Sequence, residues 1–482
     1  MPKRDEYEIV VGLEVHAQLL TKTKLFCGDT TEFGKEPNTQ ISVISLGYPG
    51  SLPRLNKEAI SLAIRLGLAC HCEIVQHNYF ARKNYFYADL PKGYQISQHT
   101  TPICKGGHVD IAVGKEVKTI RLNRIHIEED AGKSIHDENS EFSNLDFNRA
   151  GMPLLEIVTE PDLRSAEEAF AYVTTLRKLV RHLNVCDGNM EQGSLRCDVN
   201  ISVRKKGAQM LGTKVEVKNL NSIRFIKKAI EHESERLVEL LEAGKTIVQE
   251  TRGFDENSFS TYSIRVKEDE DDYRYFPEPD LPPFFISNEM IEGIRSAMPA
   301  LQSEVKEKLV GEYHLSAYDS EQLSNDTEMS SFFFELAKQS GNYKASANWI
   351  LGPIRNHLNT SEVSLDEVKL PAKTVAEIIN LIDAGKISYG IAVQQVFPAV
   401  LKNPSLDITR FIKDNQLEVQ SSQTEIEQLI DAALTKHSEK ITEYRKGKKG
   451  LISLFVGEVM RLSKGKADAK LVTEKIIEKL KA

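Results

Sequence analysis

The N-terminal part of the chain, up to about residue 290, contains short runs in which apolar and polar residues alternate. In the run 9–18 the odd positions are apolar, whereas Glu14, His16 and Gln18 fall on the other side. The runs 196–204 and 214–219 alternate in the same way. Because successive side chains of a strand point to opposite sheet faces, this spacing predicts many strands in a mixed α+β domain. Each polar set would line one face, which is typical of a solvated sheet and also of a ligand site.

From about residue 290 onward the apolar residues follow helical spacing. Helices are predicted over 331–338, around 349–358 and over 375–382, and Gly385 is expected to end the last of these. The dipeptide at 403–404, Asn-Pro, indicates a boundary, and amphipathic stripes follow at 426–434, 451–462 and 471–480. We therefore predict a domain 1–292, an all-α helical domain 293–407 and a small all-α tail domain 408–482.

The charge of the tail differs from that of the whole chain. The 482 residues carry a net charge of −8, so no overall basic field favours nucleic-acid binding. Residues 441–482, however, hold 11 Lys/Arg against 5 Asp/Glu. The basic loops 445–450 and 464–466 suit a phosphate backbone, although a lysine-rich run is also common on a solubilising surface.

The sequence has features of a protein that stays inside the cell. No run of 18 apolar residues occurs, so we expect no membrane span. The first residues lack an apolar signal core, and six cysteines in so long a chain make no disulfide framework. We expect a cytoplasmic protein.

Common nucleotide and hydrolase motifs are absent from the sequence. There is no phosphate-binding loop of the G-x-x-x-x-G-K-[ST] kind, no G-x-G-x-x-G, no G-x-S-x-G and no H-E-x-x-H. Any ATP chemistry would therefore need another kind of site. The acidic run 268–272 is by itself typical of a solvated turn.

Two glutamates interrupt apolar surfaces. Strand alternation places Glu129 on the face of two isoleucines, and Glu156 lies inside the apolar run 152–158. A buried carboxylate must be paired, hydrogen-bonded, protonated or metal-bound. Together with Glu14 and His16 these acids suit Mg²⁺, which prefers hard oxygen ligands. The alternative is a set of structural salt bridges, with arginines 124 and 149 as partners.

The segment 82–98 combines cations, aromatic residues and amides in a turn-rich stretch. This composition suits a phosphate, a stacked base or an amino acid. An aromatic-rich structural loop is the alternative. Of its basic residues, Lys83 and Lys92 are the candidates for neutralising phosphate oxygens.

These segments, in this order, resemble the B subunit of the tRNA-dependent amidotransferase (GatB type). The resemblance covers essentially the whole chain and rests on eight motifs: V-G-L-E-V-H at 11–16, R-K-N-Y-F-Y-A-D-L-P-K-G-Y-Q-I-S-Q at 82–98, H-I-E-E-D-A-G-K at 126–133, N-R-A-G-M-P-L-L-E-I-V-T-E-P-D at 148–162, N-M-E-Q-G-S-L-R-C-D at 189–198, E-V-K-N-L-N-S at 216–222, Q-E-T-R at 249–252 and D-Y-R-Y-F-P-E-P-D-L at 272–281.

The resemblance implies an N-terminal, mainly antiparallel β cradle that binds ATP, Mg²⁺ and the acceptor end of a mischarged tRNA. A helical domain and a tail domain that contacts tRNA would follow. The cradle would phosphorylate the side-chain carboxylate of Glu-tRNA(Gln) or Asp-tRNA(Asn), and ammonia would then give Gln-tRNA(Gln) or Asn-tRNA(Asn) for translation. A glutaminase (amidase) A subunit would supply the ammonia, and a small C subunit would complete a heterotrimer. Such an enzyme is a carbon–nitrogen ligase with glutamine as amide-nitrogen donor.

Carried over to this chain, the resemblance implies specific site residues. The metal positions are Glu14, His16, Glu128, Glu129 and Glu156. The expected catalytic residues are Glu129, Glu156 and Lys83. The basic residues expected to bind ATP are Lys83, Lys92, Arg149 and Lys218. Weaker candidates in the same cavity are Arg196 and Glu216.

The chain departs from the family pattern in three places, the simplest of which is Ala88, where relatives commonly have Pro. Many relatives carry a zinc knuckle, F-C-x-C followed by C-P-V-C-L-G-x-P-G. Here those stretches read 26–29 Phe-Cys-Gly-Asp and 42–50 Ser-Val-Ile-Ser-Leu-Gly-Tyr-Pro-Gly. Three of the four cysteines are absent, so we expect no structural zinc and a buried thiol at Cys27. Gln192 stands where relatives commonly have Glu, which removes one carboxylate.

Two other functions remain as alternatives. A noncatalytic adapter would bind tRNA and hold the amidase without turning over ATP. A free-standing carboxylate–amine ligase would hydrolyse ATP in response to a free amino acid, but the basic tail speaks against it. No amidase or glutaminase motif occurs, so we expect that the chain makes no ammonia of its own.

Overall fold

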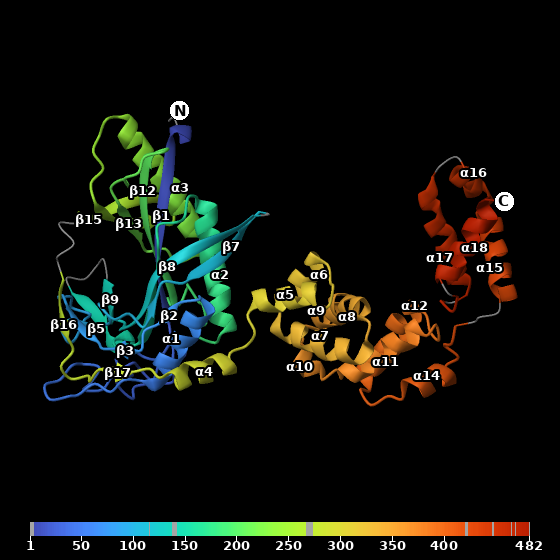
Figure 1. The fold of residues 1–482 in the computed structure, drawn as a ribbon, viewed down its shortest axis with the longest axis horizontal. Helices are drawn as coiled ribbons and strands as arrows, with labels where there is room; N and C mark the ends of the chain where they lie inside the picture. Colours follow the sequence, from blue (N-terminus) through green and yellow to red (C-terminus); the bar gives the residue numbers. More distant parts are fainter. Residues whose placement is uncertain are drawn as a thin grey trace. The chain divides into compact units, whose positions relative to one another are not determined.

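The computed structural model describes residues 4–114, 116–136, 142–266, 273–419, 423–445, 448–463, 465–467 and 469–481. The chain forms two compact units, Met1–Pro299 and Ala300–Ala482 (Figure 1). The acidic run 268–272 lies outside the described residues, as do positions 446, 447 and 464 of the basic loops. No helix of the described chain is long and apolar enough to cross a membrane.

The first unit is built on one large sheet, and the α+β prediction is confirmed. Its main path runs β15-β14-β13-β12-β1-β11-β8-β5-β4-β16. All neighbouring pairs on this path are antiparallel except β13 and β14. The strands are β1 (Tyr7–Gln18), β4 (Ala81–Asn84), β5 (Tyr94–Ser97), β8 (Glu116–Glu129), β11 (Pro153–Thr159), β12 (Leu195–Lys205), β13 (Val215–Lys218), β14 (Glu250–Asp255), β15 (Ser260–Val266) and β16 (Arg274–Pro277).

Shorter strands and four helices complete this unit. The strands are β2 (Glu73–Ile74), β3 (His77–Asn78), β6 (Cys104–Lys105), β7 (His108–Val113), β9 (Lys133–His136), β10 (Ser143–Asp146) and β17 (Phe284–Phe285). The helices are α1 (Lys57–Ala69), α2 (Ala166–His182), α3 (Ile223–Glu242) and α4 (Asn288–Ala297). Helix α3 packs on β12 and on α2, and α1 packs on β8. The strand β1 buries Leu13 and Val15 almost completely, as the alternation predicts.

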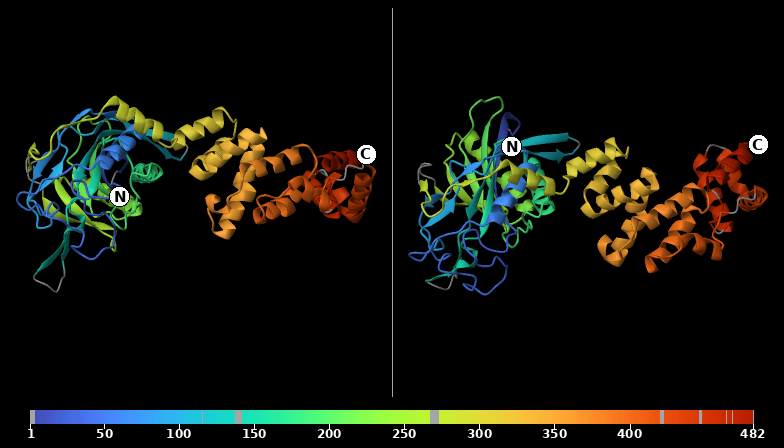
Figure 2. Two further views of the ribbon diagram at one scale, coloured as in Figure 1. Left: turned by 90° about the horizontal axis from the view of Figure 1, so that it is seen from below. Right: turned by 60° about the horizontal axis from the view of Figure 1, so that its bottom comes forward.

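The sheet curls so that strands from its two ends approach each other (Figure 2). Arg265 belongs to β15, at one end of the path, and Tyr87 lies in the loop that follows β4, near the other end. The guanidinium of Arg265 donates a hydrogen bond to the Tyr87 hydroxyl at 3.1 Å. One face of the curled sheet is therefore concave and bordered by both ends, which agrees with the expected cradle.

The loop between β1 and α1 brings together the four positions that the family resemblance aligns with zinc-knuckle cysteines. The Asp29 carboxylate accepts hydrogen bonds from the Cys27 thiol at 3.2 Å, from the backbone N–H of Ser42 at 2.9 Å and from the Ser45 hydroxyl. Cys27 is only partly buried, which corrects the prediction of a buried thiol. A carboxylate-centred hydrogen-bond cluster thus joins the two segments. The expectation of no structural zinc stays a prediction.

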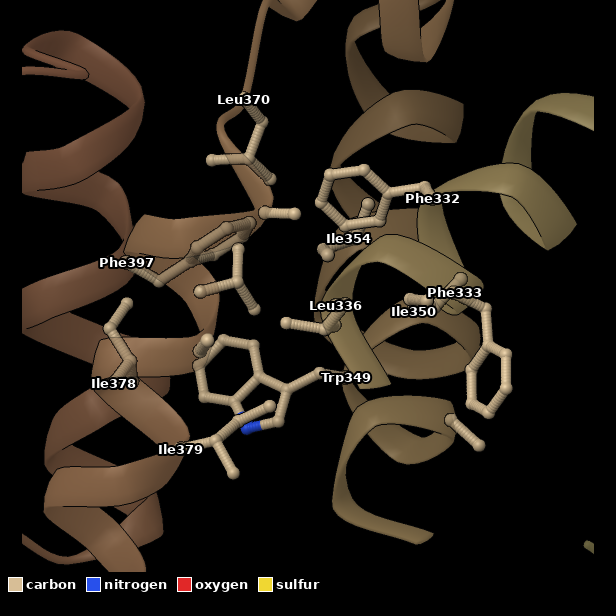
Figure 3. Close-up of a cluster of buried hydrophobic side chains, with 14 of the residues drawn as sticks. Phe332, Phe333, Leu336, Trp349, Ile350, Ile354, Leu370, Ile378, Ile379 and Phe397 are labelled. Atoms are coloured by element: carbon tan, nitrogen blue, oxygen red, sulfur yellow. The ribbon is translucent and has the colours of Figure 1, made fainter. Parts of the chain in front are cut away.

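The second unit is helical, as the spacing of its apolar residues predicts. Its first group of helices is α5 (Gln302–Gly311), α6 (Ala317–Ser324), α7 (Thr327–Ser340), α8 (Tyr343–Trp349), the π-helical η3 (Ile350–Ile354), α9 (Arg355–Ser361), α10 (Leu365–Val368), α11 (Ala372–Asp383), α12 (Tyr389–Ile391), the π-helical η4 (Ala392–Val396), α13 (Phe397–Lys402) and α14 (Ile408–Asp414). Trp349 is buried at the centre of their core and packs edge-on against Phe397 (Figure 3). Gly385 follows α11 with φ +67°, so the predicted helix end is confirmed.

A second core lies in the last part of the chain. Its helices are α15 (Gln423–Lys436), α16 (Ser438–Arg445), the 3₁₀ turn η5 (Lys449–Leu451), α17 (Ile452–Leu462) and α18 (Ala469–Lys481). The three predicted amphipathic stripes form α15, α17 and α18, whose buried residues include Ile430, Phe455 and Ile476. Helix α14 contributes Ile408 and Ile412 to the preceding core instead. The domain boundary at 407/408 stays a prediction.

Candidate active site

One row of polar side chains crosses the concave face of the sheet. In the register, Arg196 of β12 lies opposite His16 of β1, His16 lies opposite Glu156 of β11, and Glu156 lies opposite His126 of β8. Residues directly opposite each other on neighbouring strands point to the same sheet face. Glu128 follows His126 by two positions and shares that face. The long apolar strands thus bring together polar residues that lie far apart in the sequence.

Two imidazoles and three carboxylates meet in this row. His16 Nε2 lies 3.4 Å from a Glu128 oxygen, 3.6 Å from a Glu156 oxygen and 3.7 Å from a Glu14 oxygen. His126 Nε2 lies 3.3 Å from Glu156 and 3.6 Å from Glu128. Except for Glu14, which is partly exposed, these carboxylates are almost fully buried. We call these five residues the carboxylate–histidine cluster.

The charges of the cluster shift the pKa values of its members strongly. Burial alone would lower the pKa of His126, but the Glu156 and Glu128 carboxylates outweigh it and raise this pKa to about 9. Burial would raise the pKa of Glu128, but hydrogen bonds from His126 and His16 lower it to about 2. The pKa of Glu14 is raised by burial and by the neighbouring Glu156 charge. The cluster therefore compensates buried negative charge with imidazolium protons.

The donor set of the cluster suits a divalent cation. Among the described residues, ligand atoms converge closely enough to hold a metal ion in two overlapping groups. One group is His16, Glu128 and Glu156, and the other is His16, Glu14 and Asp198. Carboxylate oxygens with one imidazole favour a hard cation such as Mg²⁺ over a thiolate-seeking metal. A bound cation would take over the charge compensation that the imidazolium protons provide.

Basic side chains surround the cluster on the same face. Lys83 of β4 lies opposite Tyr275, and its ammonium sits 4.7 Å from the Tyr273 ring centroid. Within the described chain, Lys83 forms no ion pair, although the Glu128 and Glu156 charges raise its pKa against the effect of burial. It is therefore the basic side chain of the predicted set that is available to an added anion.

The other predicted basic residues on this face have carboxylate partners. Lys218 lies 2.7 Å from Asp198 and 3.3 Å from Glu216. Arg149 and Arg196 both form ion pairs with Asp130, at 2.7 and 3.1 Å respectively. These two cations keep the pKa of Asp130 below its usual value, although burial alone would raise it. These three cations therefore already have carboxylate partners in the structure.

Glu129 is separated from the other predicted metal positions. Its carboxylate accepts hydrogen bonds from Lys92 Nζ, at 2.6 Å to one oxygen, and from the Ile96 backbone N–H at 2.8 Å. Strand alternation places it on the sheet face opposite to Glu128. Lys92 is only 12% exposed and lies against Gly47, whose φ of +67° lets the loop approach closely. The predicted roles of Glu129 and Lys92 would require this closed ion pair to open.

Sequence reasoning missed two members of the site. His126 completes the cluster, and Asp198 joins its second cation group. Arg124, named from the sequence as a partner of the buried acids, lies 3.5 Å from a Glu156 oxygen. His126 could have been found from its spacing, because it precedes Glu128 by two positions in one strand. Gln192, in contrast, is exposed in the turn before β12, where its backbone N–H donates to the Asn189 side chain at 3.1 Å.

Comparison with known proteins agrees with this architecture. Residues 9–292 match the GatB/GatE catalytic domain and residues 331–480 match the GatB domain. The chain is 47% identical to the B subunit of the aspartyl/glutamyl-tRNA(Asn/Gln) amidotransferase of Thermodesulfovibrio yellowstonii, over 99% of this chain and the whole relative. It is 47% identical to that of Geotalea daltonii, over 98% of this chain and 99% of the relative, and 46% identical to that of Persephonella marina, over 99% and 100%. The chain therefore belongs to the GatB family, the B subunits of tRNA-dependent amidotransferases.

Proposed function

We propose that this chain activates the side-chain carboxylate of Glu-tRNA(Gln) or Asp-tRNA(Asn) with ATP and converts it to the amide. The convergence of the carboxylate–histidine cluster with Lys83 on one concave sheet face carries the proposal. A carboxylate is a poor electrophile, and phosphorylation gives it a leaving group. Phosphoryl transfer needs charge compensation and positioning more than a covalent catalyst, and the cluster offers both.

Mg²⁺ fits the residues of the cluster. We propose Glu128, Glu156 and His16 as its main ligands, with Glu14 close enough to join them. Their hard oxygens support this choice, and His16 would bind the ion as a neutral imidazole, with the ion taking over the charge compensation. When bound, the ion would polarise the phosphoryl oxygens and offset their charge. Of the predicted positions, Glu129 fits least, because Lys92 already occupies its carboxylate.

Lys83 is proposed to bind phosphoryl oxygens. Its ammonium is held over an aromatic ring, has no ion-pair partner in the described chain, and lies near Glu128 and Glu156. An anion beside it would gain a charge-assisted hydrogen bond without first breaking a salt bridge. The other predicted phosphate-binding residues, Lys218, Arg149 and Lys92, would each have to leave a carboxylate partner.

The proposed chemistry has two balanced steps. A side-chain carboxylate oxygen of the aminoacyl group attacks the γ-phosphorus of ATP, the bond to the β,γ-bridging oxygen breaks, and ADP leaves. Ammonia then attacks the acyl carbon, inorganic phosphate leaves with the bonding electrons, and loss of a proton gives the amide. No residue of this chain has to become covalently attached in either step.

We further propose that ammonia comes from a glutaminase A subunit and that a small C subunit completes the assembly. The relatives are named as subunits, which supports a multi-subunit enzyme. The basic surface of the tail is proposed to contact the tRNA phosphate backbone.

The test uses the purified chain with Mg²⁺, ATP, Glu-tRNA(Gln) and ammonium chloride, and it measures Gln-tRNA formation. We expect ATP-dependent product that is lost in Glu128→Gln. If activity requires the amidase partner, the complex completes the site. If the complex binds tRNA without forming product or hydrolysing ATP, the chain is an adapter and the proposal is wrong.

A further inference from the structure

Three tyrosines form a rim at the edge of the concave face. The ring centroids of Tyr85 and Tyr87 lie 5.7 Å apart, those of Tyr85 and Tyr273 lie 5.6 Å apart, and both pairs meet edge to face. Tyr85 follows β4 and Tyr273 precedes β16, so two different segments build this tyrosine rim. Tyr87 is 51% exposed and keeps much of its surface open to solvent.

The tyrosine rim is continuous with the site. Tyr85 and Tyr273 continue the alternation that places Lys83 and Tyr275 on the concave face. The Lys83 ammonium lies 4.7 Å from the Tyr273 centroid and 5.7 Å from the Tyr85 centroid. It is also close enough to Glu128 for that charge to raise the pKa of Lys83. The chain thus presents, in order, open aromatic surface, a cation with no ion-pair partner in the described residues, and the carboxylate–histidine cluster.

The rim is also held in place from the opposite end of the sheet. Arg265 of β15 donates to the Tyr87 hydroxyl at 3.1 Å, and its pKa is raised mainly through a hydrogen bond with Tyr273. An exposed aromatic ring usually has several rotamers, and this anchor restricts them. The guanidinium adds a cation beside the rings, which strengthens stacking of an electron-rich heterocycle.

We propose that the tyrosine rim binds the purine ring of a nucleotide whose phosphate or ester end lies at Lys83 and the cluster. The order of aromatic, cationic and metal-binding groups matches the order of base, phosphate and metal in a nucleotide. Two sources supply this chemistry, ATP and the terminal adenosine of the tRNA. The inference rests on the proposed function, because only that function places phosphate at Lys83.

The experiment compares Tyr87→Ala, Tyr87→Phe and a control, Phe276→Ala, in the full chain. Phe276 is 46% exposed on β16 and alternates with Tyr275, so it faces away from the rim. Binding of ATP and of inorganic tripolyphosphate is measured with Mg²⁺ present. Loss of one base–aromatic stack is expected to lower the affinity roughly 5- to 160-fold. If ATP supplies the base, Tyr87→Ala weakens ATP but not tripolyphosphate. Tyr87→Phe keeps the ring but loses the bond from Arg265, so its ATP affinity falls between those of Tyr87→Ala and wild type, whereas Phe276→Ala binds both ligands normally.

A second arm tests the tRNA source with two RNA minihelices, one ending in CCA and one lacking the terminal adenosine. If tRNA supplies the base, Tyr87→Ala removes the affinity difference between the two RNAs and leaves ATP binding unchanged. Unchanged binding of both ATP and the minihelices in Tyr87→Ala would overturn the inference. Failure of the proposed function would show differently: wild-type protein would not bind tripolyphosphate with Mg²⁺, or Glu128→Gln would bind it equally well.

Discussion

The neighbouring glutamates 128 and 129 offer a sharp test of the site, because the structure gives them different surroundings. Glu128 faces two imidazoles, whereas Glu129 forms a buried ion pair with Lys92. The substitutions Glu128→Gln and Glu129→Gln are chemically identical and one position apart. We expect the first to remove Mg²⁺ binding and the second to lower stability.

The size of each effect follows from the geometry. Removing one partner of a buried pair costs about 3–5 kcal/mol. The lower end applies to Glu129→Gln, since the new amide oxygen can still accept from the Ile96 N–H. For a unit of this size, about 3 kcal/mol corresponds to a midpoint lower by roughly 5 °C. A double variant, Lys92→Met with Glu129→Met, should recover part of this loss because no unpaired charge stays buried.

Glu128→Gln removes a negative charge that would lie beside the divalent cation. At an effective dielectric constant of about 20, two unit charges 4 Å apart interact by about 4 kcal/mol, and a divalent ion interacts more strongly before its dehydration is counted. We expect Mg²⁺ affinity to fall at least about 100-fold, which corresponds to ~2.7 kcal/mol. The melting midpoint of the metal-free protein should fall by less than in Glu129→Gln, because Glu156 still pairs with the imidazoles and an imidazole that loses a carboxylate partner can release its proton.

Two measurements on both variants decide between the roles. Isothermal titration with Mg²⁺ gives the affinity, and thermal unfolding in a metal chelator gives the stability of the metal-free protein. The tRNA-dependent ATPase rate should vanish in Glu128→Gln and persist in Glu129→Gln at a temperature below its midpoint. The reasoning is refuted if Glu129→Gln loses Mg²⁺ binding while its midpoint stays at the wild-type value. Glu129 would then be the ligand, as the sequence motif alone suggests.

Three further predictions concern other parts of the chain. A metal chelator should leave the protease resistance of the loop 19–56 unchanged, whereas Asp29→Asn should make this loop cleave faster, as limited proteolysis can show. Replacing Lys448 and Lys449 by Ser should weaken tRNA binding and reduce its salt slope by roughly one for each lost phosphate contact; an unchanged slope would remove this loop from the interface. Hydrogen bonds from Arg461 and Lys436 lower the pKa of Glu458 to about 2. Because the folded pKa lies below the unfolded value, this stabilisation is complete above about pH 4.5 and is lost as the pH falls toward 2. Wild type should therefore melt above Glu458→Gln at pH 7, and the gap, followed by circular dichroism, should close as the pH falls; a gap that stays constant with pH would contradict this reasoning.

The strands could be predicted because each carries its own alternation. The polar side of the run 9–18 became the concave face of β1, and the apolar side became buried core, as period two requires. The burial of Glu129 and Glu156 was also predictable, because an acid inside an apolar run is buried together with its apolar neighbours. These features depend on residues close in sequence.

The partners of those acids depend instead on register, which a single strand does not encode. Whether Glu156 meets His16, His126 or an arginine is decided by how β11 aligns with β1 and β8. A shift by one residue in either pairing would turn a whole polar set to the other face. The motif H-I-E-E shows the consequence: alternation alone sends its two glutamates to opposite faces, but only the three-dimensional pairing shows that Glu128 meets the histidines and Glu129 meets Lys92.

The curl of the sheet also explains why the sequence predicted only part of the tyrosine rim. The aromatic segment 82–98 suggested a base stack, but the other residues of the rim lie far away in sequence. Tyr273 directly precedes β16 and Arg265 lies in β15, and these two strands are the opposite ends of the sheet path. These strands approach only because twist accumulates over many neighbouring strands and bends the sheet back toward itself. The same curvature that encloses the carboxylate–histidine cluster therefore also brings the residues of the tyrosine rim together. A substitution that flattened the sheet should weaken nucleotide binding and metal binding together, whereas changes in Tyr87 or Glu128 alone should separate them.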